Sequence, residues 1–312
     1  MINNFISIAQ SAIGTWADHV GFSNCISVCK MGNKIYGCNY SSVLIYNKTD
    51  ETLEKINKIN GLNDVGIKLL RENSYNNKVM VVYENSNIDF IDSDDKVYNY
   101  SDIFRKNFSG KKNINEVLYV GKMAYLSCGF GIILFDTDKL EIKDTYIIGP
   151  GGSNLEVFQV ALTDSFMYAA TPNGLLRCNY KTKLLNDFNN WETINSGITS
   201  GYYAHVVNHN GLILAGYSPY KQSGIGGKDT VYQFSNNTWS KFPNIAFPYH
   251  IKKIKSLGSH LCILDQFGSL FFNSSWGISA YVTQYDNKFT YASDAIIDGK
   301  DYWIADVSYG LI

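Results

Sequence analysis

Apolar residues occur along this chain in short runs, and each run is bounded by a turn rich in Gly, Asn, Asp or Ser. Residues 35–46 show the pattern: Ile-Tyr-Gly-Cys, a polar reversal, then Val-Leu-Ile-Tyr. Tyr, Phe, Ile and Val favour the pleated, half-buried surface of a strand, whereas Gly, Asn and Asp favour tight reversals. The pattern predicts an all-β protein.

The same unit recurs at nearly even intervals. Its second strand is centred in successive copies at positions 36, 81, 125, 168, 214, 262 and 303. Strand-rich repeats of about 40–50 residues are typical of β-propeller blades, which stack radially so that each sheet packs on its neighbours. An open stack would leave broad faces exposed at both ends, and a two-domain β-sandwich would not give so even a period. We therefore predict a seven-bladed β-propeller with four-stranded blades.

Two details of the turns refine this prediction. Gly131, Gly174, Gly268 and Gly310 occupy the reversal between the second and third strands, where we expect a positive φ that glycine adopts at low cost. Asn87 takes the same place in the second copy. The fifth copy is stretched, because residues 216–229 form an inserted loop between its second and third strands.

The two ends of the chain suggest how the ring closes. Residue 312 lies two residues into the third strand of the seventh unit, so we expect the last blade to be incomplete and the domain to be truncated at its C-terminus. The segment 14–20 resembles the Trp-containing fourth strands around Trp191 and Trp239, and we expect it to pair at the otherwise open edge of the last blade.

Residues 13–312 are predicted to form a single propeller domain. Residues 1–12 have a short apolar run followed by small residues, which fits the remnant of a secretory signal peptide. A disordered start is the alternative.

Composition narrows the classes of function. The formal net charge is −1, and the sequence has no basic stripe of the kind that recruits nucleic acid. No stretch is long and apolar enough for a transmembrane segment. The six cysteines include no Cys-x-x-Cys pair and no His at metal-ligand spacing, so we expect buried free thiols, no metal site and no cofactor.

Several segments resemble the N-terminal propeller of the PorZ family, which belongs to the surface attachment complex of the type IX secretion system. The similarity is dense from about residue 14 to 197 and thinner afterwards. The matching segments are 16–19, 60–66, 83–89, 125–132, 141–149 and 187–191.

This resemblance implies a protein on the extracellular face of the outer membrane, with the periplasm as the alternative location. In that family, two propellers precede a small C-terminal sorting domain, so we expect this chain to lack the second propeller and the sorting domain. The implied partners are the attachment-complex proteins, which anchor secreted cargo to anionic lipopolysaccharide, and the lipopolysaccharide or another glycan. The alternative function is a glycan-sensing propeller domain of a hybrid two-component regulator, which has the same blade pattern.

We predict that the protein is not an enzyme, because no converging set of acid, base and nucleophile is visible. Two carboxylates close together in a deep axial pocket would instead favour a glycosidase. The predicted binding site lies on the face that carries the inter-blade loops and the turns between second and third strands. Its candidate residues are the basic pair Lys111 and Lys112, and the aromatic residues Tyr217 and Tyr220 of the insertion.

Overall fold

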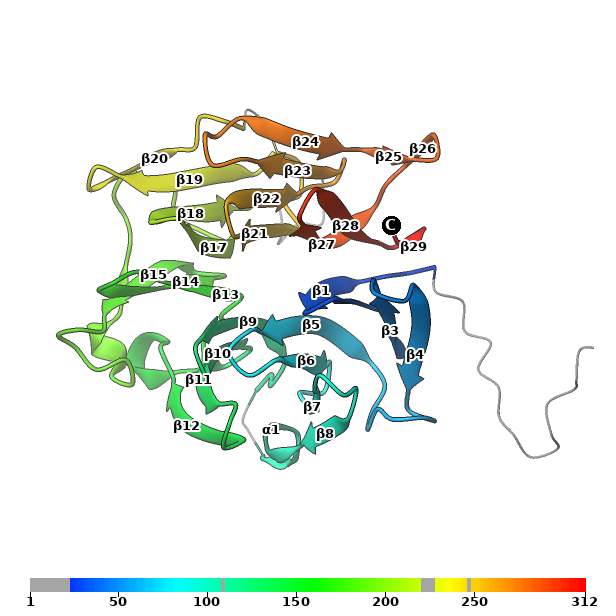
Figure 1. Cartoon of the computed structure of the whole chain (residues 1–312). Helices are drawn as coiled ribbons and strands as arrows, with labels where there is room; N and C mark the ends of the chain where they lie inside the picture. Colours follow the sequence, from blue (N-terminus) through cyan, green and yellow to red (C-terminus); the bar gives the residue numbers. More distant parts are fainter. Residues whose placement is uncertain (1–22, 108–109, 220–227, 246–247) are drawn as a thin grey trace, which may run out of the picture.

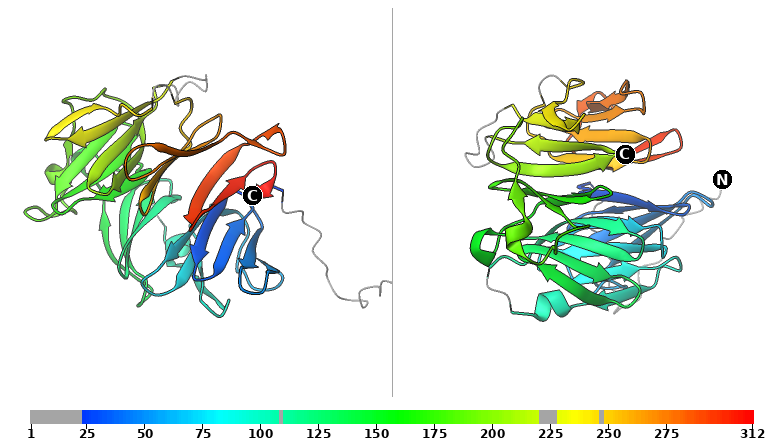
Figure 2. Two further views of the ribbon diagram at one scale, coloured as in Figure 1. Left: turned by 45° about the horizontal axis from the view of Figure 1, so that its top comes forward. Right: turned by 90° about the vertical axis from the view of Figure 1, so that its left-hand side faces the viewer.

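The computed structural model of the chain describes residues 23–107, 110–219, 228–245 and 248–312. Apart from one two-stranded hairpin, its described strands form seven sheets that follow one another around a central axis (Figures 1 and 2). Within each sheet, consecutive strands pair antiparallel from the axis outward. The predicted all-β, seven-bladed β-propeller is therefore confirmed.

The first four blades each have four strands. Blade one contains β1 (Ser27–Met31), β2 (Lys34–Cys38), β3 (Ser42–Asn47) and β4 (Thr52–Asn57). Blade two contains β5 (Ile67–Asn73), β6 (Lys78–Tyr83), β7 (Ile88–Ile91) and β8 (Val97–Tyr100). Blade three contains β9 (Ile114–Val120), β10 (Met123–Cys128), β11 (Gly131–Asp136) and β12 (Glu141–Tyr146). Blade four contains β13 (Gln159–Leu162), β14 (Phe166–Thr171), β15 (Gly174–Asn179) and β16 (Glu192–Thr193).

The later blades include one with three strands in the described part of the chain. Blade five contains β17 (Tyr203–His209), β18 (Leu212–Tyr217), β19 (Thr230–Ser235) and β20 (Thr238–Lys241). Blade six contains β21 (Lys253–Leu257), β22 (His260–Leu264), β23 (Ser269–Phe272) and β24 (Ile278–Val282). Blade seven contains β27 (Ala292–Asp298), β28 (Asp301–Asp306) and β29 (Gly310–Leu311).

Short elements occupy some of the connections. A hairpin of β25 (Gln284–Tyr285) and β26 (Lys288–Phe289) joins blades six and seven. The helical elements are α1 (Asp102–Arg105), η1 (Pro150–Gly152) and η2 (Phe188–Asn190). The seven repeat positions inferred from the sequence all fall in second strands, from Tyr36 in β2 to Trp303 in β28. The repeat was therefore placed in the correct register.

The first strands line the axis and close a complete circle. β1 contacts β5, and contacts then continue through β9, β13, β17, β21 and β27, which returns to β1. Apolar side chains fill the space between neighbouring sheets, in seven clusters that correspond to the seven interfaces between described blades. Packing between blades, rather than one common core, thus holds the ring together.

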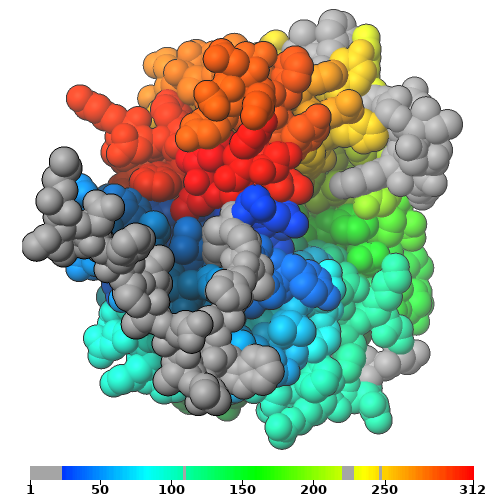
Figure 3. Space-filling model, turned by 90° about the vertical axis from the view of Figure 1, so that its right-hand side faces the viewer, coloured from blue at the N-terminus to red at the C-terminus, as the bar shows by residue number. Residues whose placement is uncertain are grey.

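The seam between blades seven and one has the smallest of these clusters. It contains Cys25, Val28, Ile35, Ile296 and Ala305, all of them buried. The first and last sheets lie side by side in Figures 1 and 2, and Figure 3 shows their surfaces in contact. The described residues therefore close the ring directly between the two blades.

Polar contacts supplement this small cluster. The backbone N–H of Cys25 donates to the carbonyl of Asp306 at 3.0 Å. The carboxylate of Asp298, at the end of β27, forms ion pairs with Lys30 of β1 and Lys48 beyond β3. The predicted pairing of residues 14–20 with the last blade lies outside the described residues and stays a prediction.

Three local predictions can be compared with the backbone. The positive φ expected at the reversal is found at Gly131 (150°), Gly174 (146°) and Gly310 (88°). It is not found at Gly268, where a Cβ would instead lie 2.3 Å from the carbonyl oxygen of Val282, so close approach of the outer strand excludes a side chain.

The prediction for the turn of the second copy was wrong by one residue. In the second copy Ser86 (φ 71°), not Asn87, has the positive φ.

The prediction of buried free thiols is confirmed, because all six cysteines are buried and free of disulfides. Burial raises the pKa of the Cys25 thiol to about 12, against the weaker effect of its backbone hydrogen bonds.

We expect the Ile35→Ala substitution at the seam to lower the free energy of unfolding by about 2–5 kcal/mol, because it removes a fully buried side chain from between the first and last blades. Ile59→Ala is the matched control, since Ile59 is 67% exposed, and it should unfold like the wild type. Urea denaturation followed by tryptophan fluorescence measures both. Equal stability of the two variants would contradict a packed seam.

Candidate functional site

Lys111 and Lys112 lie in the segment that joins β8 to β9. The side chain of Lys111 is exposed. The Nζ of Lys112 instead donates to the carbonyl oxygens of Phe104 (2.6 Å) and Lys106 (3.2 Å), and lies 5.8 Å from the centre of the Phe104 ring. Lys112 therefore fixes the end of α1 against this loop, and Lys111 is the exposed cation of the pair.

Tyr217 is the last residue of β18 and is half-buried. Its ring centre lies 5.4 Å from that of Tyr203 and 6.4 Å from that of Tyr232, within the aromatic packing between blades four and five. Tyr220 lies outside the described residues. Tyr217 on blade five and Lys111 between blades two and three belong to different parts of the ring, so the structure does not bring the two together. Their role in binding stays a prediction.

Charged side chains of the first strands meet at the axis of the ring. Asp294 of β27 is completely buried there. Its carboxylate accepts hydrogen bonds from Nη1 of Arg71 (3.0 Å), Nζ of Lys255 (3.1 Å) and Oγ of Ser27 (2.8 Å). It also forms an ion pair with Nζ of Lys253 at 3.1 Å. One carboxylate thus joins the inner strands of blades one, two, six and seven.

The ionisation of Asp294 is set by these neighbours. Burial on its own would raise the pKa of the carboxyl group. The positive charges of Lys253, Lys255 and Arg71, together with the Ser27 hydroxyl, outweigh burial and hold the pKa well below its ordinary range. Asp294 is therefore an anion at neutral pH.

Arg71 also extends the arrangement to blade three. Its Nε and Nη2 donate to the two carboxylate oxygens of Glu116 on β9, at 2.5 and 2.6 Å. This paired geometry matches the fork of a guanidinium to a carboxylate. Burial raises and Arg71 lowers the pKa of Glu116, and the net direction is downward. We call Ser27, Arg71, Glu116, Lys253, Lys255 and Asp294 the axial network.

Gln159 of β13 completes the connections across the axis. Its amide oxygen accepts from the backbone N–H of Val206 at 3.3 Å, and its amide nitrogen donates to the carbonyl of Ile254 at 3.4 Å. These bonds join blades four, five and six. Every inner strand is thus linked to another by a polar side chain at the axis.

Two hollows lie along the axis on either side of the network, and Arg71, Glu116 and Gln159 line both. The loop-side hollow, at the starting ends of the inner strands, has a volume of about 230 Å³. It is lined by Lys68, Leu69, Arg71, Asn115, Glu116, Phe158, Gln159, Ala204, His205, Lys252 and Lys253. The other hollow lies at the far ends of the inner strands, beside the turns that join first to second strands, and we call it the turn-side hollow. Its volume is about 460 Å³.

The lysines of the loop-side hollow are partly withdrawn from water. Burial lowers the pKa of Lys68, Lys252 and Lys253, and nearby carboxylates only partly offset this effect. Lys68 donates to Oδ1 of Asn115 at 2.8 Å, and Lys252 donates to the carbonyl of Ala292 at 3.2 Å. The hollow therefore has cationic donors where the inter-blade loops meet the axis.

The carboxylates of Glu116 and Asp294 can be compared with the pair of carboxyl groups that a glycosidase requires. Glu116 and Asp294 contact the same guanidinium, so two carboxylates do lie close together at the axis. A glycosidase of this kind needs one carboxyl group with a raised pKa as its general acid. The pKa of both groups is lowered, so this pair lacks the required acid.

The described residues contain neither a cluster of metal-ligating side chains nor a long apolar helix. In residues 23–312, apart from the gaps stated above, no group of three or more His, Cys, Asp or Glu side chains is arranged to hold a metal ion. The Nε2 of His205 donates to the carbonyl of Ile251, and the Nδ1 of His209 hydrogen-bonds with the hydroxyl of Ser256. None of the helices in the same part of the chain is long and apolar enough to cross a membrane.

Sequence reasoning missed the axial network entirely. The signal was present, because Arg71, Glu116 and Asp294 are charged residues within first strands, and each has an apolar residue directly beside it. The sequence comparison used the second and third strands of each copy. A comparison of the first strands would have shown that charged residues of both signs occur in them.

We expect Asp294→Asn to lower the free energy of unfolding at pH 7 by about 3–5 kcal/mol, because it leaves buried cations without their anion. Since the folded-state pKa lies below the ordinary value of about 3.9, the stabilisation by Asp294 is complete above that value and is lost as the pH falls below it. The difference between wild type and variant should therefore shrink below about pH 4.

Chemical denaturation at pH 7, 5 and 3 measures this difference. Asp301→Asn is the matched control, since Asp301 is an exposed residue of the same blade, and it should match the wild type at each pH. A deficit of Asp294→Asn that stays constant down to pH 3 would contradict the assigned ionisation.

Comparisons with known proteins agree with the fold. The family described as "TSS9, PorZ, N-terminal beta-propeller domain" matches residues 35–192, which are 158 of the 312 residues. A search of curated proteins finds no match.

Among solved structures, the chain is similar to PorZ of Porphyromonas gingivalis, which is described as an essential bacterial surface component of the type IX secretion system. The TM-score is 0.73 at 17% identity, over 94% of this chain and 37% of that one. At this identity the structural similarity demonstrates the fold alone. The family match covers more than half of the chain and establishes family membership. The chain belongs to the PorZ N-terminal β-propeller family.

Proposed function

We propose that the protein is a non-catalytic, cell-surface component of type IX secretion, which holds attachment-complex proteins and binds anionic lipopolysaccharide through its loop face. Membership of the PorZ propeller family is the observation that carries this proposal. The chain spans 37% of the PorZ chain of known structure, so the role of that whole protein is extended here as a proposal. The location we propose is the outer-membrane surface.

The geometry of the loop face supports a binding role. The inter-blade loops and the starting ends of the inner strands form one face, on which Lys111 is exposed. Arg105, in the last turn of α1, is exposed nearby in the sequence. Guanidinium and ammonium groups on such loops suit the phosphate and carboxylate groups of an anionic glycan.

The lipopolysaccharide part of the proposal predicts that Lys111→Ala weakens binding severalfold at low salt, because one exposed cation is lost. Both proteins should bind more weakly at 1 M than at 0.1 M salt, since the Debye length falls from about 10 Å to about 3 Å. Titration of purified anionic lipopolysaccharide by calorimetry measures the affinities. Lys111 is preferred to Lys112, because Lys112 also shapes the loop.

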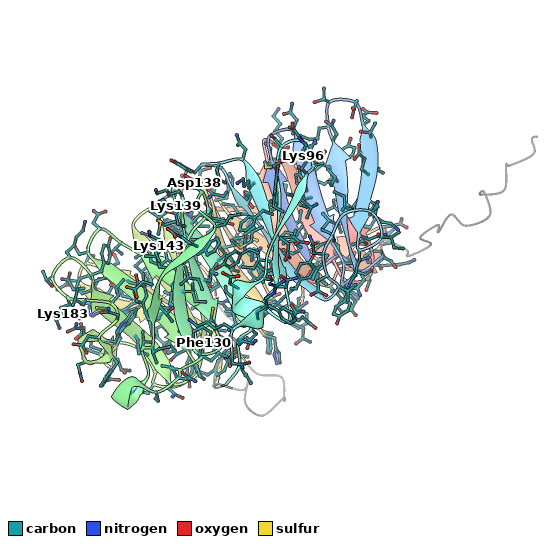
Figure 4. The ribbon with its side chains drawn as sticks, turned by 90° about the horizontal axis from the view of Figure 1, so that it is seen from below. Lys96, Phe130, Asp138, Lys139, Lys143 and Lys183 are labelled. Carbon is teal, nitrogen blue, oxygen red and sulfur yellow. The ribbon has the colours of Figure 1, made fainter. Side chains whose placement is uncertain are left out.

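Lys183→Ala is the control. Figure 4 places Lys183 at the periphery of blade four, where its side chain is exposed, and its loss should leave the affinity unchanged. Equal affinity of Lys111→Ala and wild type would remove Lys111 from the site. A folded wild type that fails to bind lipopolysaccharide would overturn the binding role itself.

A further inference from the structure

The two axial hollows differ in charge. The turn-side hollow is balanced, because Arg71 and Lys255 face Glu72 and Glu116. The loop-side hollow has four cationic residues, Lys68, Arg71, Lys252 and Lys253, against the single carboxylate of Glu116. Its formal charge is therefore 4 − 1 = +3, in a protein whose net charge is −1. In a concave site, walls of low dielectric constant focus the electric field of such charges and so strengthen their attraction for an anion.

Not all four cations are neutralised in the same way. Arg71 is bound by Glu116 and Asp294, and Lys253 is bound by Asp294. Lys68 and Lys252 instead donate to neutral oxygens, those of the Asn115 amide and the Ala292 carbonyl. Neither lysine forms an ion pair within 4.0 Å in the described part of the chain.

Carboxylates do act on these two lysines at longer range. Glu156, Glu116 and Glu84 favour the charged form of Lys68, and Asp306 and Asp265 favour that of Lys252. These carboxylates partly offset the effect of burial on the two lysines. They do not line the hollow, except for Glu116, which Arg71 already binds. The ammonium groups thus retain the capacity to bind an incoming anion.

The neutral lining suits the same kind of ligand. Asn115 and Gln159 contribute side-chain amides and His205 an imidazole, while Phe158 adds an apolar wall. The volume of about 230 Å³ lies below the roughly 300–1,000 Å³ of sites for drug-sized ligands. A single small charged group therefore fits better than an extended chain of sugars.

We propose that the loop-side hollow is an oxyanion-binding site, in which Lys68 and Lys252 bind the carboxylate of an acidic sugar or a phosphate group. The ligand is either a free anion or the charged terminus of a larger glycan. This proposal does not rest on the proposed function, because Lys111 is not among the residues that line the hollow.

The test is calorimetric titration at low salt with three probes: inorganic phosphate, glucuronate and glucose. Glucuronate and glucose differ at one carbon, which bears the carboxylate, so the pair isolates the charge. We expect phosphate or glucuronate to bind and glucose to bind at least tenfold more weakly. Binding of phosphate alone identifies a free-ion site, whereas binding of glucuronate identifies a site for an acidic sugar, and both results support the proposal.

The double variant Lys68→Met/Lys252→Met keeps most of each apolar stem and should weaken binding of the anionic probe by about tenfold or more. Lys183→Met is the matched control and should bind like the wild type. If the double variant does not fold, Lys68→Met alone takes its place. The proposal is overturned if the wild type binds neither anion, if glucose binds as tightly as glucuronate, or if the lysine variant retains full affinity.

Discussion

The buried carboxylate of Asp294 constrains the whole ring. An ionised group at full burial is tolerated only where cations and donors reach it, and here they come from the inner strands of blades one, two and six. Those strands must therefore approach the axis at matching depth, which fixes the positions of the sheets behind them. The loop face depends on this arrangement, because its loops begin and end where the inner strands do.

The seam shows how a ring compensates for a weak interface. Its apolar cluster is the smallest of the seven, and blade seven has three strands where the other blades have four in the described residues. The ion pairs of Asp298 with Lys30 and Lys48 and the bond from Cys25 to Asp306 lie at this interface. The polar contacts thus lie at the interface with the smallest apolar cluster.

The repeat could be predicted from the sequence because alternation and turn chemistry are local. Tyr36 and Trp303 identify second strands without any knowledge of their partners. The axial network could not be found in this way, since Asp294 and Arg71 are 223 positions apart and meet only once the ring has closed. The contacts of Lys112 with Phe104 and Lys106 could not be predicted either, because they depend on how the loop folds back, and a binding role for Lys112 stays a prediction.

The circular order of the blades has a consequence for how the chain folds. Contacts within each blade join residues close in sequence and form quickly, whereas the bonds of the seam span 250 positions or more and carry a larger loop-closure cost. Hairpins should therefore form first and the junction of blades seven and one last. The same junction should open first in the native state, so amide hydrogens of β1 and β27 should exchange with solvent sooner than those of the inner strands on the opposite side of the ring.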